Sequence, residues 1–237
     1  MFTIELAGIR IRIDNRYPYL DRLCRSYRVD GTDAAFSVSV TEEEILEESR
    51  NGDFPADCCE GICAYRKICE GLIPYRIFLM HSSVVEVDGF AYAFTAASGV
   101  GKSTHTKLWM KNIPGCRIIN GDKPLYRWEE DGSFTVFGTP WNGKENWGEN
   151  LSAPLSGILF LERGEGNSIR RAKEPEAIAR LMPQLYLRGD REAVNLQLSM
   201  ANALIRSVPF WVLACNISDD AARLAYQAVR KERKEGK

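Results

Sequence analysis

One segment, residues 94–109, contains the residue types that phosphate chemistry requires. It reads FTAASGVGKSTHTKLW, so an apolar, strand-like run leads through a glycine-rich turn into a helix-like run. Glycines let the backbone curl so that several N–H groups point into one concavity. A helix that begins there adds its unpaired amides and the positive end of its dipole. The segment therefore predicts a loop that binds phosphate groups.

Two side chains at the end of this loop supply further chemistry. Lys102 is expected to contact the outer phosphates of a nucleotide, and the Ser103 hydroxyl is expected to ligate Mg²⁺. The full nucleotide-binding pattern has another glycine at position 96 or 97, where this chain has Ala96-Ala97. The alternative is therefore an ordinary strand-to-helix turn that carries Gly-Lys-Ser. The candidate phosphate-binding residues are Ser98, Gly99, Val100, Gly101, Lys102, Ser103 and Thr104.

An acid and a histidine complete the candidate catalytic set. Asp122 follows the short apolar run 117–119, some 20 residues after the loop. A buried strand there would bring its carboxylate to the phosphates, to ligate Mg²⁺ or to deprotonate an acceptor hydroxyl. The alternative is that residues 120–122 form only a turn. His81 either assists proton transfer and orients the carboxylate or is structural. His105, one turn into the helix, is expected to be structural.

The segment 138–150, GTPWNGKENWGEN, predicts a long functional loop between two strands. Lys144 is expected to contact a phosphate, and Glu145 to assist the metal or the acceptor. Trp141 and Trp147 are expected to line a nucleotide or substrate face, with pinning of the loop as the alternative. Further cations are available from Arg163, Arg170 and Arg171, although arginines near strand ends are usually solvated.

The composition restricts the class of protein. The chain has 237 residues, 45% of them hydrophobic, and a formal net charge of −1, so no basic excess favours nucleic acid or a membrane surface. No run reaches the roughly 18 apolar residues of a membrane span, and the first residues do not resemble a secretory signal. We therefore expect a cytoplasmic protein. The seven cysteines are interpreted as reduced thiols, because Cys58, Cys59, Cys63 and Cys69 lack paired metal-ligand spacing.

The hydrophobic pattern divides the chain into two parts. Residues 1–75 predict a small α+β region, and residues 76–237 predict an α/β nucleotide-binding domain. Asp88-Gly89 predicts a hairpin turn, so the strand that enters the loop is antiparallel to its predecessor. In the first part the expected elements are a hairpin (2–13), a helix (17–27), a strand (35–41) and helices (42–48 and 55–74). In the second they are strands (83–87, 90–95, 117–119, a hairpin-like strand through 128, 134–137, 155–161 and 210–214) and helices (102–111, 176–187 with an interruption at Pro183, 190–207 and one from 218).

These motifs resemble the HPr kinase/phosphorylase family, whose relative in fold is phosphoenolpyruvate carboxykinase. The resemblance covers residues 76–150 through motifs and residues 151–215 through general pattern. It implies a phosphoenolpyruvate carboxykinase-like P-loop fold with a mixed sheet, and Mg²⁺-dependent phosphate transfer from a nucleotide to a protein serine. By the same resemblance, Gly99, Gly101, Lys102 and Ser103 bind phosphates, Ser103 also ligates the metal, His81 is the family's histidine, and Asp122 is the base or a metal ligand.

The chain departs from that family at Gly121-Asp122-Lys123, where the family has two adjacent aspartates, and in residues 1–75. The expected function is an ATP-dependent, Mg²⁺-requiring kinase for a hydroxyl, possibly a serine of a peptide or protein other than HPr. The alternatives are a nucleotide-binding regulatory module without catalysis and a small-molecule kinase. A carboxykinase is disfavoured because the chain is short. Assembly into a homo-oligomer stays open.

Overall fold

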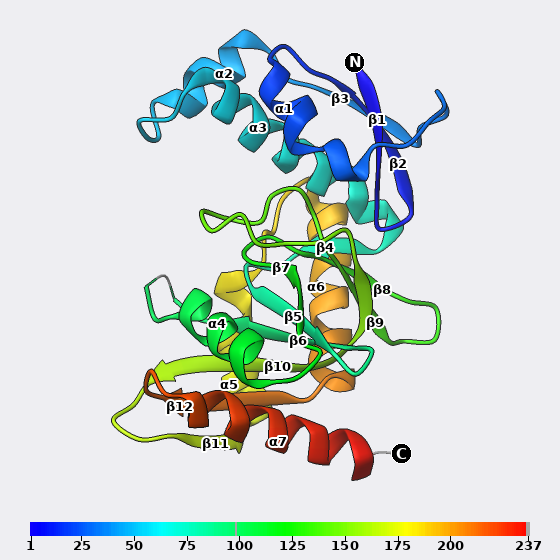
Figure 1. Ribbon diagram of the computed structural model, residues 1–237. Helices are drawn as coiled ribbons and strands as arrows, with labels where there is room; N and C mark the ends of the chain where they lie inside the picture. Colours follow the sequence, from blue (N-terminus) through cyan, green and yellow to red (C-terminus); the bar gives the residue numbers. More distant parts are fainter. Residues whose placement is uncertain (98, 236–237) are drawn as a thin grey trace.

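The computed structural model describes residues 1–97 and 99–235, with side chains described through Glu232. Its first part is a small layer of strands and helices, at the top of Figure 1. The strands β1 (Phe2–Leu6) and β2 (Ile9–Asp14) form the expected hairpin, and β3 (Phe36–Ser39) lies parallel to β2. The helices are α1 (Pro18–Leu23), α2 (Glu42–Ser49) and α3 (Ala56–Leu72), with 3-10 turns at Arg25–Tyr27 and Ile73–Tyr75. A capping box between Thr41 and Glu44 begins α2.

The second part is built on one mixed sheet, which among the described residues has nine strands. The order is β4-β8-β9-β10-β6-β5-β7, with β12 beside β10 and β11 beside β12. Strand β10 lies parallel to β6 and β12 and antiparallel to β9. The strands are β4 (Ile77–Leu79), β5 (Ser83–Val87), β6 (Phe90–Thr95), β7 (Arg117–Asn120), β8 (Leu125–Trp128), β9 (Phe134–Phe137), β10 (Ser152–Arg163), β11 (Ser168–Arg171) and β12 (Phe210–Cys215). This is the mixed α/β architecture that the sequence predicts.

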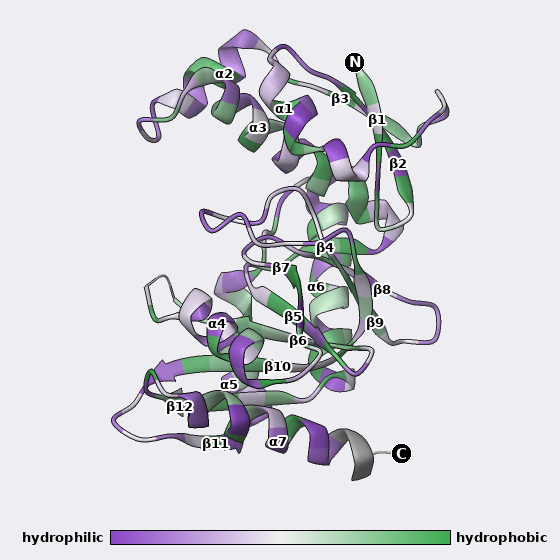
Figure 2. Cartoon of the chain, in the orientation of Figure 1, coloured by the Kyte–Doolittle hydropathy of each residue, from purple (hydrophilic) through white to green (hydrophobic). Residues whose placement is uncertain are grey.

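Helices cover both faces of the central sheet. Successive residues of β5, such as Val84 and Val85, belong to different buried clusters, because strand side chains alternate between faces. The helices α5 (Glu174–Leu181) and α6 (Arg191–Ser207) contribute to one cluster. The helices α4 (Lys102–Asn112) and α7 (Asp219–Glu235) contribute to the other. Figure 2 shows apolar residues along the inner strands and polar residues along the outer side of α7.

The boundary at residue 75 stays a prediction, since the two parts share buried side chains. The cluster that contains Ile4 and Ile68 of the first layer also contains Ile77, Leu125 and Trp141. None of the described helices has the length and apolar content that crossing a membrane requires.

Three details differ from the sequence-based expectation. The short strands β4 and β11 were not expected, because β4 has only three residues and β11 (SIRR) has a single apolar residue. The predicted helix 176–187 instead ends at Leu181, continues as a 3-10 turn through Gln184, and is followed by an isolated bridge between Leu185 and Met80. The interruption falls where the sequence predicts it, at Pro183, because proline lacks the N–H that continues a helix; the difference is that the α-helix does not resume after it.

His105 lies in the core, as expected of a structural residue. Its Nε2 accepts a hydrogen bond from Trp109 Nε1 at 2.9 Å, so in the neutral ring the proton is on Nδ1. That buried Nδ1 has no partner among the described residues. Burial lowers the pKa of His105 from 6.5 to about 4, because a protonated ring would be poorly solvated there.

Acidification from about pH 7 to about pH 5 is therefore expected to destabilise the fold. Between pH 6.5 and about 4 the unfolded chain binds a proton at His105 that the folded chain does not. Stability therefore falls with falling pH, by at most about 1.4 kcal/mol per pH unit from this group. Urea unfolding of the wild type and of His105→Gln, whose amide oxygen replaces the acceptor, measures the effect. The wild type should show the steeper pH dependence, and equal slopes would contradict the assignment.

Candidate functional site

The turn between β6 and α4 has the backbone that the glycine spacing predicts. Gly99 has φ 79° and Gly101 has φ 125°, in the positive region that other residues adopt only with strain. The Val100 N–H donates to the Ala97 carbonyl at 3.3 Å, and α4 begins at Lys102. Ser98, a predicted phosphate-binding residue, lies outside the described residues. A strand-to-helix turn is thus present, and its binding of phosphate stays a prediction.

A cavity of about 460 Å³ opens at this turn. It brings together four segments that are separate in the sequence: His81, the glycine-rich loop, the turn that carries Asp122, and the long loop 138–150. Val100 instead packs beside the apolar cluster under α4. The lining residues are His81, Gly99, Gly101, Lys102, Ser103, Thr104, Gly121, Asp122, Asn142, Gly143, Lys144, Glu145 and Trp147.

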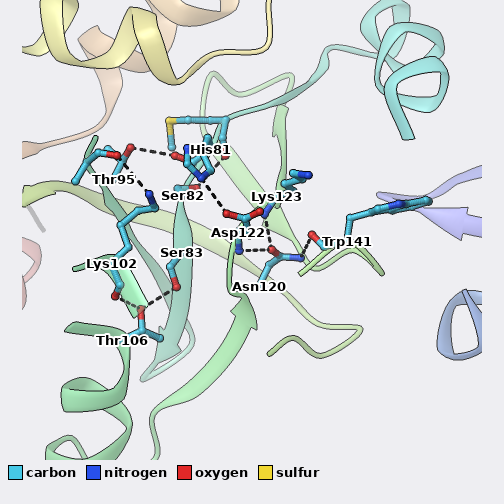
Figure 3. Close-up of polar contacts among 12 residues, drawn as sticks. His81, Ser82, Ser83, Thr95, Lys102, Thr106, Asn120, Asp122, Lys123 and Trp141 are labelled. Atoms are coloured by element: carbon cyan, nitrogen blue, oxygen red, sulfur yellow. Dashed lines mark hydrogen bonds and ion pairs between the residues drawn. The ribbon is translucent and has the colours of Figure 1, made fainter. Parts of the chain in front are cut away.

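His81 and Asp122 form a hydrogen-bonded pair in this cavity. His81 Nε2 lies 2.9 Å from Asp122 Oδ1 (Figure 3). The backbone of His81 is held on both sides, because its N–H donates to Gln184 O at 2.8 Å and its carbonyl accepts from Thr95 Oγ1 at 3.0 Å. The Ser82 N–H donates to Asp122 O at 3.1 Å, which ties the two segments together. The arrangement makes His81 a partner that fixes the orientation of the Asp122 carboxylate.

The electrostatics keep Asp122 ionised. Burial alone would raise the pKa of Asp122, and it is the largest single influence. The hydrogen bond and charge of His81, with the charges of Lys123 and Lys102, outweigh it, so the pKa lies below the usual 3.8. A carboxylate in this state at neutral pH can ligate a cation or accept a proton.

Lys102 extends along the inside of the glycine-rich loop. Its Nζ donates to Ala96 O at 3.3 Å, which uses one of the three ammonium donors. Burial lowers the pKa of Lys102, and the nearby Asp122 carboxylate opposes that shift. A partly desolvated ammonium group interacts more strongly with an anion than a fully hydrated one does. Lys102 lines the cavity, and its contact with phosphate oxygens stays a prediction.

Asn120, which sequence reasoning treated only as part of a turn, organises the acidic turn. It is completely buried, and its Oδ1 accepts from the N–H groups of Asp122 and Lys123 at 2.8 and 2.7 Å. Its Nδ2 donates to Thr139. It also donates to Trp141 O (Figure 3). Residues 120–122 thus form a turn and also deliver a carboxylate to the cavity. The signal in the sequence was asparagine two residues before the acid, a spacing that favours such turns.

The two tryptophans of the loop 138–150 have different surroundings. Trp147 lines the cavity, and Lys107 Nζ lies 4.8 Å from its ring centroid. Trp141 is buried away from the cavity, stacked on Tyr65 of α3, which agrees with the pinning alternative. Gly143 is required in this loop, since it has φ 83° and a Cβ there would lie 2.8 Å from Asp122 Cβ.

The charged residues of this loop and the three arginines are placed as follows. Lys144 and Glu145 both line the cavity, and Glu145 forms an ion pair of 3.8 Å with Lys107. Arg163 reaches the glycine-rich loop, because its Nη2 donates to Gly99 O at 2.7 Å. Arg170 pairs with Glu176 and Arg171 with Glu232, on the surface and away from the loop.

The residues present fit a nucleotide-bound magnesium ion. Within the described part of the chain, no group of three or more His, Cys, Asp or Glu side chains has the arrangement of a metal site, the cysteine cluster included. Mg²⁺ in nucleotide sites usually takes only one or two protein oxygens, with phosphates and water completing the shell. The Ser103 hydroxyl and the Asp122 carboxylate line one cavity and offer such oxygens.

The fold and the site together define a mixed α/β protein with a glycine-rich loop facing a His–Asp pair. No known family profile matches the chain, and no curated protein matches it in sequence. A solved structure to which the chain is similar is the Hpr(Ser) kinase/phosphatase from Coxiella burnetii, at a TM-score of 0.39 and 12% sequence identity. The similarity covers 66% of this chain and 91% of that one. A similarity of this size carries no functional argument, so the proposals below rest on the geometry of the site.

Proposed function

We propose that this protein transfers a phosphoryl group from ATP to a hydroxyl group, with Mg²⁺. The observation that carries the proposal is the single cavity in which the Gly-Lys-Ser loop faces the hydrogen-bonded pair of His81 and Asp122. A binding loop alone would suit any phosphate ligand. An ionised, oriented carboxylate opposite the loop is the additional group that phosphoryl transfer requires.

In this proposal the loop residues hold the polyphosphate and the acid acts on the acceptor. Lys102 and the loop amides stabilise the charge on the transferred group. His81 holds Asp122 Oδ1, and Oδ2 is the oxygen that we assign to the acceptor hydroxyl. The acceptor oxygen bonds to the γ-phosphorus, the bond from that phosphorus to the bridging oxygen breaks, ADP leaves, and the hydroxyl proton passes to Asp122 and then to solvent. A carboxylate of low pKa suffices, because the transition state is loose and the proton leaves late.

Mg²⁺, when bound, would neutralise charge on the β- and γ-phosphate oxygens. Ser103 is our first candidate ligand, and Asp122 is either a second ligand or the proton acceptor. Lys144 and Glu145 line the same cavity, so we assign the lysine to a phosphate and the glutamate to the metal or the acceptor. The acceptor in this proposal is a serine of a peptide or protein.

Labelled ATP tests the proposal. Purified protein is incubated with γ-labelled ATP, Mg²⁺ and candidate peptides, proteins and small hydroxyl compounds, first those encoded by neighbouring genes. We expect acceptor-dependent transfer of the label. A protein that binds ATP with Mg²⁺ but transfers label to no acceptor would be a regulatory module, and transfer only to small compounds would make it a small-molecule kinase. Absence of nucleotide binding would reject the proposal entirely.

A further inference from the structure

Helix α3 of the first layer contacts the turn that carries Asp122. The Tyr65 hydroxyl donates to Lys123 O at 2.7 Å, next to the acid in the chain. The Tyr65 ring stacks on Trp141 with centroids 4.2 Å apart and an interplanar angle of 10°. Trp141 Nε1 in turn donates to Gly61 O of the same helix at 2.9 Å. The acidic turn and the long loop are thus both attached to α3.

A second set of contacts joins these two attachments. Asn120 binds the acidic turn through its Oδ1 and the long loop through its Nδ2. Thr139 Oγ1 donates to Lys123 O at 2.9 Å, so this carbonyl accepts from both Thr139 and Tyr65. These side chains are all buried, and buried hydrogen bonds are costly to break because water does not replace the lost partner. The turn, the loop and α3 therefore form one connected unit.

We infer that the first layer completes the catalytic site, with Tyr65, Trp141 and Asn120 as positioning residues for Asp122. This inference rests on the proposed function. The backbone on both sides of Asp122 is held by Asn120 and Tyr65, and its carboxylate is held by His81. The contacts from α3 reach the acidic turn and the loop 138–150, whereas the glycine-rich loop is built between β6 and α4. We therefore expect the first layer to act mainly on the rate of transfer, while the glycine-rich loop supplies most of the contacts with ATP.

The sharpest test compares Tyr65→Phe with Tyr27→Phe. Both residues are buried phenols of the first layer, and each donates one hydrogen bond to a carbonyl of the second part, Tyr65 to Lys123 and Tyr27 to Glu149. Only the first carbonyl belongs to the acidic turn. We expect Tyr65→Phe to lower kcat about tenfold with unchanged KM for ATP, since one lost hydrogen bond and a displaced acid act on the transition state alone. Tyr27→Phe should change kcat less than about twofold.

Two further measurements and one substitute variant make every outcome decisive. Thermal melting shows whether both variants fold equally well. If Tyr65→Phe unfolds, it is replaced by Trp141→Phe, which keeps a stacking ring but loses the hydrogen-bond donor to Gly61. Amide hydrogen exchange at Asp122 and Lys123 should be faster in Tyr65→Phe than in the wild type, and exchange in α4 should be unchanged. This exchange can be measured even if the wild type transfers no phosphate. In that case the proposed function fails, and the positioning of the acidic turn by Tyr65 is still tested. Equal kcat values in the two tyrosine variants, or unchanged exchange at the acidic turn, would overturn the inference.

Discussion

Replacing Asp122 with asparagine is expected to lower phosphoryl transfer by about 10²- to 10⁴-fold, the range of a positioned acid or base. Asparagine has the same shape and still accepts a hydrogen bond from His81, so the turn should keep its structure. Asparagine lacks the negative charge of the carboxylate. Asp122 has that charge at neutral pH, because its pKa lies below the usual value. Initial rates with labelled ATP measure the loss, while ATP binding should remain measurable.

The matched control for this variant is Asp131→Asn. Asp131 also accepts hydrogen bonds within a turn, from Ser133, but it does not line the cavity. Its replacement should leave transfer within about twofold of the wild type. Transfer that persists in Asp122→Asn, or falls equally in both variants, would remove Asp122 from the catalytic set. A partial recovery of Asp122→Asn with added Mg²⁺ would favour a role as metal ligand over a role as base.

Replacing Lys102 with alanine is expected to weaken ATP binding about 10- to 150-fold, which corresponds to the loss of about 1.5–3 kcal/mol for a hydrogen bond to a charged group. Burial partly desolvates the Lys102 ammonium group and thereby lowers its pKa. The hydrogen bond from Nζ to Ala96 O is long, at 3.3 Å. The ammonium group is therefore available to a phosphate. Titration calorimetry with ATP and Mg²⁺ measures the affinity directly.

Lys111→Ala controls for the removal of a positive charge from the same helix. Lys111 is exposed and bonded to Asp219 of α7, outside the cavity. Because exposed charges are well screened, its removal should change ATP affinity less than about twofold. Unchanged affinity in Lys102→Ala would mean that this lysine does not hold the nucleotide, and the glycine-rich turn would then lose its main functional assignment.

Local sequence signals predicted the strands, turn and helix that surround the candidate site. Glycines at 99 and 101 permit the positive φ that the loop adopts, and Asp88-Gly89 forms the turn of the β5–β6 hairpin, so the strand–turn–helix unit follows from short-range rules. The apolar run before Asp122 forms β7, which brings the acid to the cavity. These features depend on neighbours in the sequence, which is why they were accessible without a structure.

Long-range contacts were not predictable in the same way. Nothing near Trp141 in the sequence indicates that its partner is Tyr65, because the two residues belong to segments with no shared pattern. Asn120 resembled an ordinary turn residue, although its side chain joins two distant segments. Strand β4 is too short to show a period of two, and β11 has only one apolar residue, so neither carries an apolar alternation. The roles of the phosphate-binding residues and of Lys144 and Glu145 stay predictions.

The apolar cluster that joins the two parts has a practical consequence for attempts to shorten the protein. Ile77, Leu125 and Trp141 are covered by side chains that come from residues 1–75. A truncated chain starting at residue 76 would present these side chains to water and would tend to aggregate. Removing residues 1–75 is therefore not a route to a smaller stable form of the second part.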